Sequence, residues 1–424
     1  MERSLAGAVL FLVTACAGAA PPALPSPQEI PALEARYAAA PADRDAVLRL
    51  AAAYQQAGRA QDAATLLEPV LARDDSDAAA AFQLAVAYED LERFADARRI
   101  YTQYVSTAGS PELRRRVQGR LALLERRELE AAARSALAQE QQLAATTPEP
   151  QTVGVFPFLS TTNDELTPLG KALAELLTTD LSQTSRLRVV ERARIQMLLD
   201  ELALAESGRV DPATAARTGR MLGAGRIVQG RIDGGESALR IQALVVPVPT
   251  AQLDETPIAQ EGAIGYFFDM QASIALELYR RLGIQLTPAE RARVAARPTE
   301  NVQALLAFGF GLDAEDAGDW TQAIEHFRRA VTLDPGFAEA RAHLQRAEAA
   351  AAAAQETPVQ LALYAPLEWD DVASWIRRRE RFAGVDRMIP SPDGRDPTSE
   401  VLGLEGLDRG ILIDLIIRRP ASSR

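Results

Sequence analysis

Apolar positions recur at two different spacings along the 424-residue chain, and the change of spacing divides it. Over residues 41–145 they follow helical spacing, whereas over 150–285 short β-branched runs alternate with amphipathic helical segments. Helical spacing returns over 286–356. The pattern predicts an α/β domain with a small mixed sheet, flanked on both sides by all-α helical hairpins.

The first helical segment contains an internal repeat of 34 residues. The stretch "LAAAYQQAGRAQDAATLL" aligns with "LAVAYEDLERFADARRIY" further along the chain. The equivalent positions are Leu50 and Leu84, Tyr54 and Tyr88, and Ala63 and Ala97. This period and order of residues resemble the tetratricopeptide repeat, a helix–turn–helix unit. We expect the small residue to let the two helices approach, and the tyrosine to fill the gap to the next helix.

A third match to the repeat lies downstream in "FGFGLDAEDAGDWTQAIEHFRRAVTLDPGF". The residues at motif positions are Gly318, Trp320, Ala323, Phe327, Ala330 and Pro335. Proline ends the second helix of the unit because it has no N–H for the helical ladder. A further helix over residues 337–354 is expected to cap it. Such arrays present a concave surface that binds partner proteins, with a purely structural spacer as the alternative.

A long helix from Pro111 to about Ala144 is expected to cap the first two repeats. Its apolar residues recur at helical spacing, and arginines lie between them. We interpret those arginines as a solvated face of the helix.

The middle segment alternates predicted strands and helices. Strands are expected over residues 152–160, 186–192, 226–232, 239–248 and 257–264. Helices are expected over residues 165–183, 193–204, from 212 onward, and 268–283. Asp211 before Pro212 is a typical helix start, and Gly283 is a typical helix end.

Residues 153–232 resemble the CsgG-type domain of curli secretion lipoproteins, which is related in plan to the TolB N-terminal domain. The most specific pieces are "LTTDLSQ", "VER" and "LGA" followed by "VQG". The motif residues are Gly170, Asp180, Leu181, Glu191, Arg192, Gly223 and Gly230. We interpret them as fold-determining rather than as a ligand site. Gly170 permits tight helix packing, Glu191 interacts with amides at a helix start, and Gly223 ends a helix before a strand.

In the curli pore subunit, this resemblance implies two membrane-crossing hairpins per protomer, which assemble into one large barrel. Between Ile232 and Phe267 the chain has room for one ordinary hairpin. Pro247 and Pro249 interrupt its only apolar run, and proline cannot donate to a strand ladder. The sequence therefore favours a protein without a pore over a channel subunit.

The N-terminus has the pattern of a bacterial lipoprotein signal. The apolar run Leu5–Val13 is shorter than the roughly 20 residues of a membrane-spanning helix. It is followed by "VTAC", which resembles a lipobox, and Cys16 is the only cysteine. We expect a signal peptide over 1–15, lipidation at Cys16 and a flexible tether over 16–40. An unprocessed tail with an incidental cysteine is the alternative.

Composition excludes several function classes. The net charge of -12 disfavours nucleic-acid binding. A single cysteine leaves no disulfide or cysteine-metal site.

The two histidines, His326 and His343, lie in predicted helices and are interpreted as packing or surface residues. "GFGLDA" at Gly309 lies within a helix rather than after a strand, so it is no dinucleotide fingerprint. We expect no catalytic residue, cofactor or metal.

The sequence thus predicts a non-enzymatic, lipid-anchored scaffold or adaptor of the cell envelope. Ala17 is not an inner-membrane retention aspartate, and the resemblance to curli secretion lipoproteins implies the outer membrane, with the protein facing the periplasm. The inner membrane is the alternative. Its partners would be other envelope or secretion proteins, bound through the repeats. The sequence does not determine whether the chain forms a homo-oligomer. The alternatives are a subunit of an oligomeric secretion channel and, supported only by unassigned carboxylates, a hydrolase. Residues 357–424 form an extension of unknown fold, with one plausible strand in "GILIDLIIRRP".

Overall fold

A computed structural model of the chain describes residues 24–74, 77–107, 111–160, 166–202, 211–251 and 256–355. The expected signal peptide, Cys16 and the strand in the C-terminal extension lie outside these residues and stay predictions. In the part of the chain that is described, none of the helices combines the length and apolar character needed to cross a membrane.

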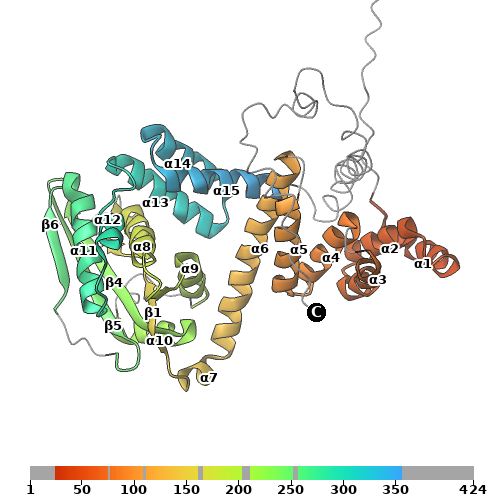
Figure 1. The fold of residues 1–424 in the computed structure, drawn as a ribbon, viewed down its shortest axis with the longest axis horizontal. Coiled ribbons are helices and arrows are strands. Elements are labelled where there is room, and N and C mark those ends of the chain that lie inside the picture. The colour runs from red at the N-terminus through yellow and green to blue at the C-terminus, as the bar shows by residue number, and fades with distance from the viewer. Residues whose placement is uncertain are drawn as a thin grey trace, which may run out of the picture. The chain divides into compact units, whose positions relative to one another are not determined.

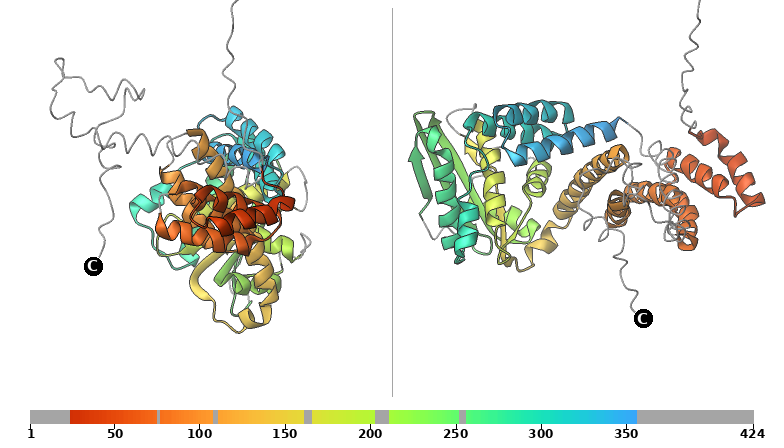
Figure 2. Two further views of the ribbon diagram at one scale, coloured as in Figure 1. Left: turned by 90° about the vertical axis from the view of Figure 1, so that its right-hand side faces the viewer. Right: turned by 45° about the horizontal axis from the view of Figure 1, so that its top comes forward.

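The N-terminal region is a series of antiparallel helix pairs (Figures 1 and 2). Its helices are α1 (Ile30–Ala39), α2 (Arg44–Gln56), α3 (Ala60–Arg73), α4 (Ala78–Asp90) and α5 (Phe94–Thr107). Asp43 and Asp77 cap α2 and α4 by accepting hydrogen bonds from backbone amides of the first turn. The same cap thus starts the first helix of both repeats.

The tether expected over residues 16–40 is too long. A short 3₁₀ helix (Pro27–Glu29) leads into α1, whose Ile30 and Leu33 are buried. These two apolar residues lie three positions apart, and burying one face of a helix offsets the entropy of ordering it. Residues 27–39 therefore belong to the folded helical region.

Helix α6 (Pro111–Ala138) is the longest described helix, and α7 (Glu140–Ala144) follows it. Helix α6 packs against α5, against α9 of the α/β domain and against α15 near the C-terminal end of the described chain. It therefore contacts all three parts of the structure rather than only capping the repeats.

The α/β domain is built on one mixed sheet in the order β3-β1-β4-β5-β6, with β2 paired to β4. The strands are β1 (Glu149–Val155), β2 (Leu159–Ser160), β3 (Arg188–Val189), β4 (Ala224–Gly235), β5 (Ala238–Pro247) and β6 (Ile258–Gly262). Strand β1 pairs in parallel with β3 and β4, and β2 pairs in parallel with β4. The β4–β5 and β5–β6 pairs are antiparallel. The α/β class with a small mixed sheet is confirmed.

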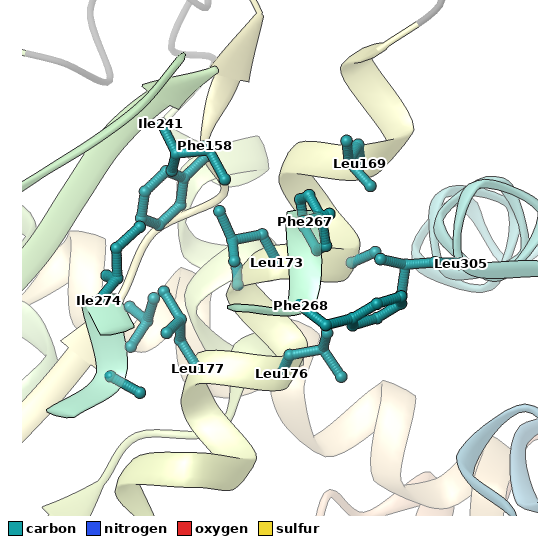
Figure 3. Packing of buried hydrophobic residues seen from close by; sticks show 14 of the residues in the cluster. Phe158, Leu169, Leu173, Leu176, Leu177, Ile241, Phe267, Phe268, Ile274 and Leu305 are labelled. Atoms are coloured by element: carbon teal, nitrogen blue, oxygen red, sulfur yellow. The ribbon is translucent and has the colours of Figure 1, made fainter. Parts of the chain in front are cut away.

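Helices cover both faces of this sheet. They are α8 (Thr167–Leu181), α9 (Arg192–Glu201), α10 (Pro212–Leu222) and α11 (Phe267–Arg281). Leucines of α8 pack with Phe267 and Phe268 of α11 and with Phe158 and Ile241 of the sheet side (Figure 3). A separate apolar cluster joins α9 and α10 to the opposite face. The sheet is therefore buried on two sides, as its mostly apolar central strands require.

The C-terminal helices are α12 (Pro288–Val294), α13 (Val302–Ala317), α14 (Trp320–Leu333) and α15 (Ala338–Ala354). Helices α13 and α14 form the hairpin that the third repeat match predicts, and α15 packs on it (Figure 1). Leu305 and Phe308 of α13 belong to the same apolar core as α8 and α11. The last repeat is therefore fused to the α/β domain by a shared core.

Candidate functional site: the charged junction along helix α6

The repeat tyrosines contact the helix before their own. The Tyr54 hydroxyl donates to Glu34 of α1 at 2.8 Å, and the Tyr88 hydroxyl donates to Glu68 of α3 at 3.0 Å. An arginine lies over each ring, 4.0 Å away for Arg59 on Tyr54 and 3.9 Å for the equivalent arginine on Tyr88. The hydroxyls thus contact the preceding helix, while Arg59, which lies on the Tyr54 ring, is the N-cap of the next helix, α3. A buried tyrosine hydroxyl needs a polar partner, and a glutamate of the preceding helix supplies it in both repeats.

The other repeat positions are mostly apolar packing sites. The buried ones are Leu50, Ala63, Leu84, Ala97, Ala323, Phe327 and Ala330. Gly318 ends α13 with a φ of 74° in the left-handed region that favours glycine. Trp320 is half-buried at the start of α14, and Pro335 follows the end of that helix. None of these positions forms a polar pocket by itself.

Arg120 of α6 is buried in an ion pair, so the interpretation of a solvated face is wrong for this arginine, whereas Arg114 and Arg115 are exposed as predicted. Glu89 of α4 is fully buried and accepts hydrogen bonds from Arg120 at 2.8 Å, Arg127 at 3.1 Å and the Tyr101 hydroxyl at 2.6 Å. A buried carboxylate requires charged partners because its desolvation is costly. The arginines therefore attach α6 to the N-terminal repeats.

Arg192, at the first position of α9, is the most buried cation of the CsgG-like motif. Its guanidinium donates to both oxygens of Asp316 at 2.7 and 2.9 Å and to Glu175 of α8 at 2.8 Å. Lys171 of α8 also contacts Asp316, at 3.1 Å. The motif arginine thus joins the α/β domain to the last turn of α13.

The environment keeps this buried cluster ionised. Burial opposes the charge of Arg192, but the negative charges of Asp316 and Glu175 outweigh it and raise the pKa of the arginine. Burial likewise disfavours the Asp316 carboxylate, and the adjacent Arg192 nevertheless holds the pKa of Asp316 below its ordinary value. Glu191 is the N-cap residue before α9, but its exposed side chain makes no capping hydrogen bond, so the expected contact with helix amides is absent.

A second set of charges connects α6, α13 and α15. Glu315 contacts His343 at 2.7 Å, and Arg346 of α15 contacts Glu125 of α6 at 2.8 Å. Arg126 of α6 donates to the backbone carbonyl of Asp316 at 2.6 Å and to that of Glu315 at 3.3 Å. Burial disfavours the Glu315 carboxylate, but His343 and Arg346 hold its pKa below the ordinary value. Charged groups of three helices therefore converge at the end of α13.

Two hollows open beside this junction. The first has a volume of about 270 Å³ and is lined by the junction charges together with Trp320 and Met197. The second has a volume of about 740 Å³ and lies along α6 and the β3 edge of the sheet. Both are lined by Glu125, Leu129 and Glu191, so they are neighbours along α6.

The remaining motif residues hold the α/β domain together. Leu181 is fully buried. A β-carbon on Gly170 would lie 1.8 Å from the Phe158 carbonyl oxygen, and one on Gly230 would lie 2.2 Å from a backbone oxygen of β5. The close partner of Gly170 is thus the chain between β1 and β2 rather than a second helix. Gly223 ends α10 with a φ of 67°.

Asp180 is a buried carboxyl of α8. It accepts a hydrogen bond from the Gln271 amide, and its backbone carbonyl accepts one from the Tyr279 hydroxyl at 2.5 Å. Burial raises the pKa of Asp180 to about 8, and the Gln271 hydrogen bond offsets this only in part. The side chain is therefore protonated in the folded protein at neutral pH.

The Asp180→Asn variant is expected to lose part of the pH dependence of stability. In the folded protein the carboxyl holds its proton up to about pH 8, whereas in the unfolded chain it releases it near pH 4. The stability contributed by protonation is complete below about pH 4 and is lost as the pH rises to about 8, by about 1.4 kcal/mol per pH unit. Urea unfolding between about pH 5 and pH 8 measures this slope. Equal slopes of unfolding free energy against pH for wild type and variant would show that Asp180 is ionised in the folded protein. The control is Asp269→Asn, which removes a carboxylate from an exposed ion pair.

Two stretches of the chain match known protein families. Residues 123–241 match the family described as curli production assembly/transport component CsgG. Residues 55–118 match the tetratricopeptide repeat. The chain contains a CsgG-type domain and tetratricopeptide repeats. The spacing of apolar residues places the start of the α/β domain at residue 150, but the CsgG match begins earlier, inside α6. The repeat match also ends inside α6, so this helix belongs to both modules.

Comparison with solved structures finds similarity to the LpoB C-terminal domain from Salmonella enterica, with 17% sequence identity and a TM-score of 0.20. The matched region covers 32% of this chain and 97% of that domain. Comparison with curated proteins finds no match.

The sequence did not single out Glu315, Asp316 or Arg126 as members of one site. Arg192 and Asp316 are 124 positions apart, and no local spacing relates them. One of the two histidines, His343, belongs to this charged junction because its ring nitrogen contacts the Glu315 carboxylate. Over the residues that the structure describes, no cluster of three or more histidine, cysteine, aspartate or glutamate residues has the arrangement of a metal site. The junction is therefore an ion-pair network beside two hollows.

Proposed function

We propose that this protein is a lipid-anchored scaffold of the bacterial cell envelope that holds partner proteins through its tetratricopeptide repeats and its CsgG-type domain. The two families support a role in protein interaction or envelope assembly. The lipobox-like stretch before Cys16 supports anchoring at a membrane.

One observation carries the scaffold role. Helix α6 contacts the repeats through Arg120 and Glu89, and it contacts the end of α13 through Arg126. The Arg120–Glu89 pair is buried, so separating α6 from the repeats would leave a buried charge without its partner, which is costly. A protein built in this way keeps its interaction surfaces attached to one body, as a scaffold requires.

The mass of the chain from Ala17 onward, made without lipid, tests the proposal against the channel alternative. We expect light scattering to show a monomer or small oligomer that stays soluble without detergent. A large closed ring that needs detergent would overturn the scaffold in favour of a secretion channel.

Anchoring has its own test. Full-length chain expressed in a bacterial host is expected to incorporate a labelled fatty acid and to fractionate with the outer membrane. The Cys16→Ser variant is expected to take up no label. Equal labelling of wild type and variant would contradict lipidation at Cys16.

A further inference from the structure

The smaller hollow beside the junction, with a volume of about 270 Å³, is walled by helices. Its lining residues come from α6, α8, α9, α13, α14 and α15, together with the residue that precedes α9. Pockets that hold a drug-sized ligand usually measure about 300–1,000 Å³. This hollow therefore has room for one long side chain or for a small molecule of similar size.

The charges of the lining favour a cation as the ligand. Five carboxylates line the hollow, those of Glu125, Glu175, Glu191, Glu315 and Asp316. Three guanidinium groups also line it, those of Arg126, Arg192 and Arg346. With its histidine neutral, the lining thus has an excess of negative charge, and Lys171 outside it is shared between Asp316 and Asp313. This excess repels an anionic ligand and attracts a cationic one.

Glu191 is the carboxylate of the lining that has no cation. Arginines pair with Glu125, Glu175 and Asp316, and the histidine contacts Glu315. The Glu191 carboxylate is exposed to solvent and makes no hydrogen bond or ion pair with any residue that the structure describes. Glu191 lines both hollows, so it lies where they adjoin. A cation that enters from solvent therefore meets an unpaired carboxylate there.

A second carboxylate oxygen, deeper in the hollow, lacks a hydrogen bond. The Glu315 side chain is 10% exposed, and its Oε2 contacts His343 at 2.7 Å. Its Oε1 is buried and accepts no hydrogen bond from any described residue. Arg346 Nε lies 3.4 Å from this oxygen without hydrogen-bond geometry, and the other end of this guanidinium already bonds Glu125. Buried polar atoms usually have partners, so Glu315 indicates that the hollow receives a hydrogen-bond donor.

An aromatic wall favours a guanidinium over other cations. Trp320 lines the hollow and is half-buried. The repeats already hold a guanidinium between an aromatic ring and a carboxylate, because Arg59 lies 4.0 Å over Tyr54 and donates to Asp62 at 2.6 Å. A guanidinium stacks on aromatic faces and presents several N–H donors at once, which an ammonium does not do. The hollow offers the same two partners, an indole and a carboxylate, to a guanidinium from outside the chain.

We propose that this hollow binds the arginine side chain of a partner protein. The guanidinium pairs with Glu191, stacks on Trp320 and donates to Glu315, whose contact with Arg346 it replaces. The proposal rests on the interaction role proposed above, and it names the chemical group that is recognised at the junction. The site is separate from the concave surface of the N-terminal repeats. A free alkylguanidine has the same chemistry, and the experiment distinguishes the two sources.

The indole signals of tryptophan report on the hollow. The chain has three tryptophans, so isotope labelling of tryptophan gives three indole N–H signals by NMR, and Trp320→Phe identifies one of them. The probe is the blocked tripeptide glycine–arginine–glycine, added to the chain from Ala17 onward. We expect it to shift the Trp320 signal until the site is saturated. The same peptide with glutamine in place of arginine is expected to leave that signal unchanged.

Two variants test the walls of the hollow. Glu191→Gln removes the unpaired carboxylate and is expected to weaken binding of the arginine peptide about fivefold. Ala193→Phe fills the hollow from α9 and is expected to abolish the shift. The matched controls are Glu201→Gln and Ala213→Phe, at exposed positions outside the lining, which should bind like wild type. Thermal unfolding of each variant checks that the fold is retained.

An unchanged Trp320 signal, or equal binding of the arginine and glutamine peptides, would overturn the proposal. A shift that neither Glu191→Gln nor Ala193→Phe reduces would place the peptide elsewhere and would overturn it as well. Butylguanidine is titrated in parallel, and tighter binding of this compound than of the arginine peptide would assign the hollow to a small molecule instead. None of these results bears on lipidation or on solution mass, so failure of this inference is distinguishable from failure of the scaffold proposal.

Discussion

Arg192→Met is expected to destabilise the folded protein by about 3–5 kcal/mol. The substitution removes the guanidinium that pairs with Asp316 and Glu175 at distances below 3 Å. Both Arg192 and Asp316 are buried, so the carboxylate that remains has lost its main countercharge in a site with little water. Lys171 still contacts Asp316 and limits the loss.

Urea unfolding followed by circular dichroism measures this effect. Arg186→Met is the control, because Arg186 pairs with Glu290 at 2.7 Å while its own side chain is 42% exposed. Such a pair contributes at most about 1 kcal/mol. The double variant Arg192→Met with Asp316→Leu is expected to recover much of the loss, since it leaves no unpaired carboxylate. If Arg192→Met matched the control, the junction would not hold the modules together.

The second large effect is expected from Gly309→Ala. A β-carbon on Gly309 of α13 would lie 2.1 Å from the backbone oxygen of Pro168 in α8. Both groups belong to helix backbones, so relief requires the two helices to move apart. We expect a loss of about 3 kcal/mol or more, at or above the usual cost of overpacking a core.

Urea unfolding measures the loss, and limited proteolysis detects release of α13–α15. Gly265→Ala is the control, because a β-carbon at Gly265 meets no atom within 4 Å. Gly119→Ala is expected to act like Gly309→Ala, since its β-carbon would lie 2.0 Å from the Ala349 oxygen of α15. Wild-type stability of Gly309→Ala would mean that α8 and α13 are not in close contact.

These glycines show how a local pattern is misinterpreted without the tertiary structure. In the sequence, Gly309 belongs to an apparent dinucleotide fingerprint and carries no expected role. In the fold it is the point where α13 approaches α8. A glycine inside a helix is compatible with close approach of another backbone, but the neighbouring residues in the sequence do not identify which backbone approaches.

The local elements were predictable because their signals are local. The 34-residue period, the Asp211 cap of α10 and the apolar spacing of α8 each depend on residues close to one another along the chain. The family resemblance followed from the same short pieces, and the family matches confirm it. Strand β3 has only two paired residues, because the chain turns into α9 at Glu191.

The sequence by itself determined the repeats, the alternation of strands and helices and the CsgG-type resemblance, since each is set by neighbours along the chain. The tertiary structure alone decided that α6 belongs to two modules, that its Arg120 is buried, and that Arg192 meets Asp316. An arginine between apolar positions looks the same in sequence whether water or a carboxylate satisfies its charge. Only the packing of distant helices removes the water and supplies the carboxylate.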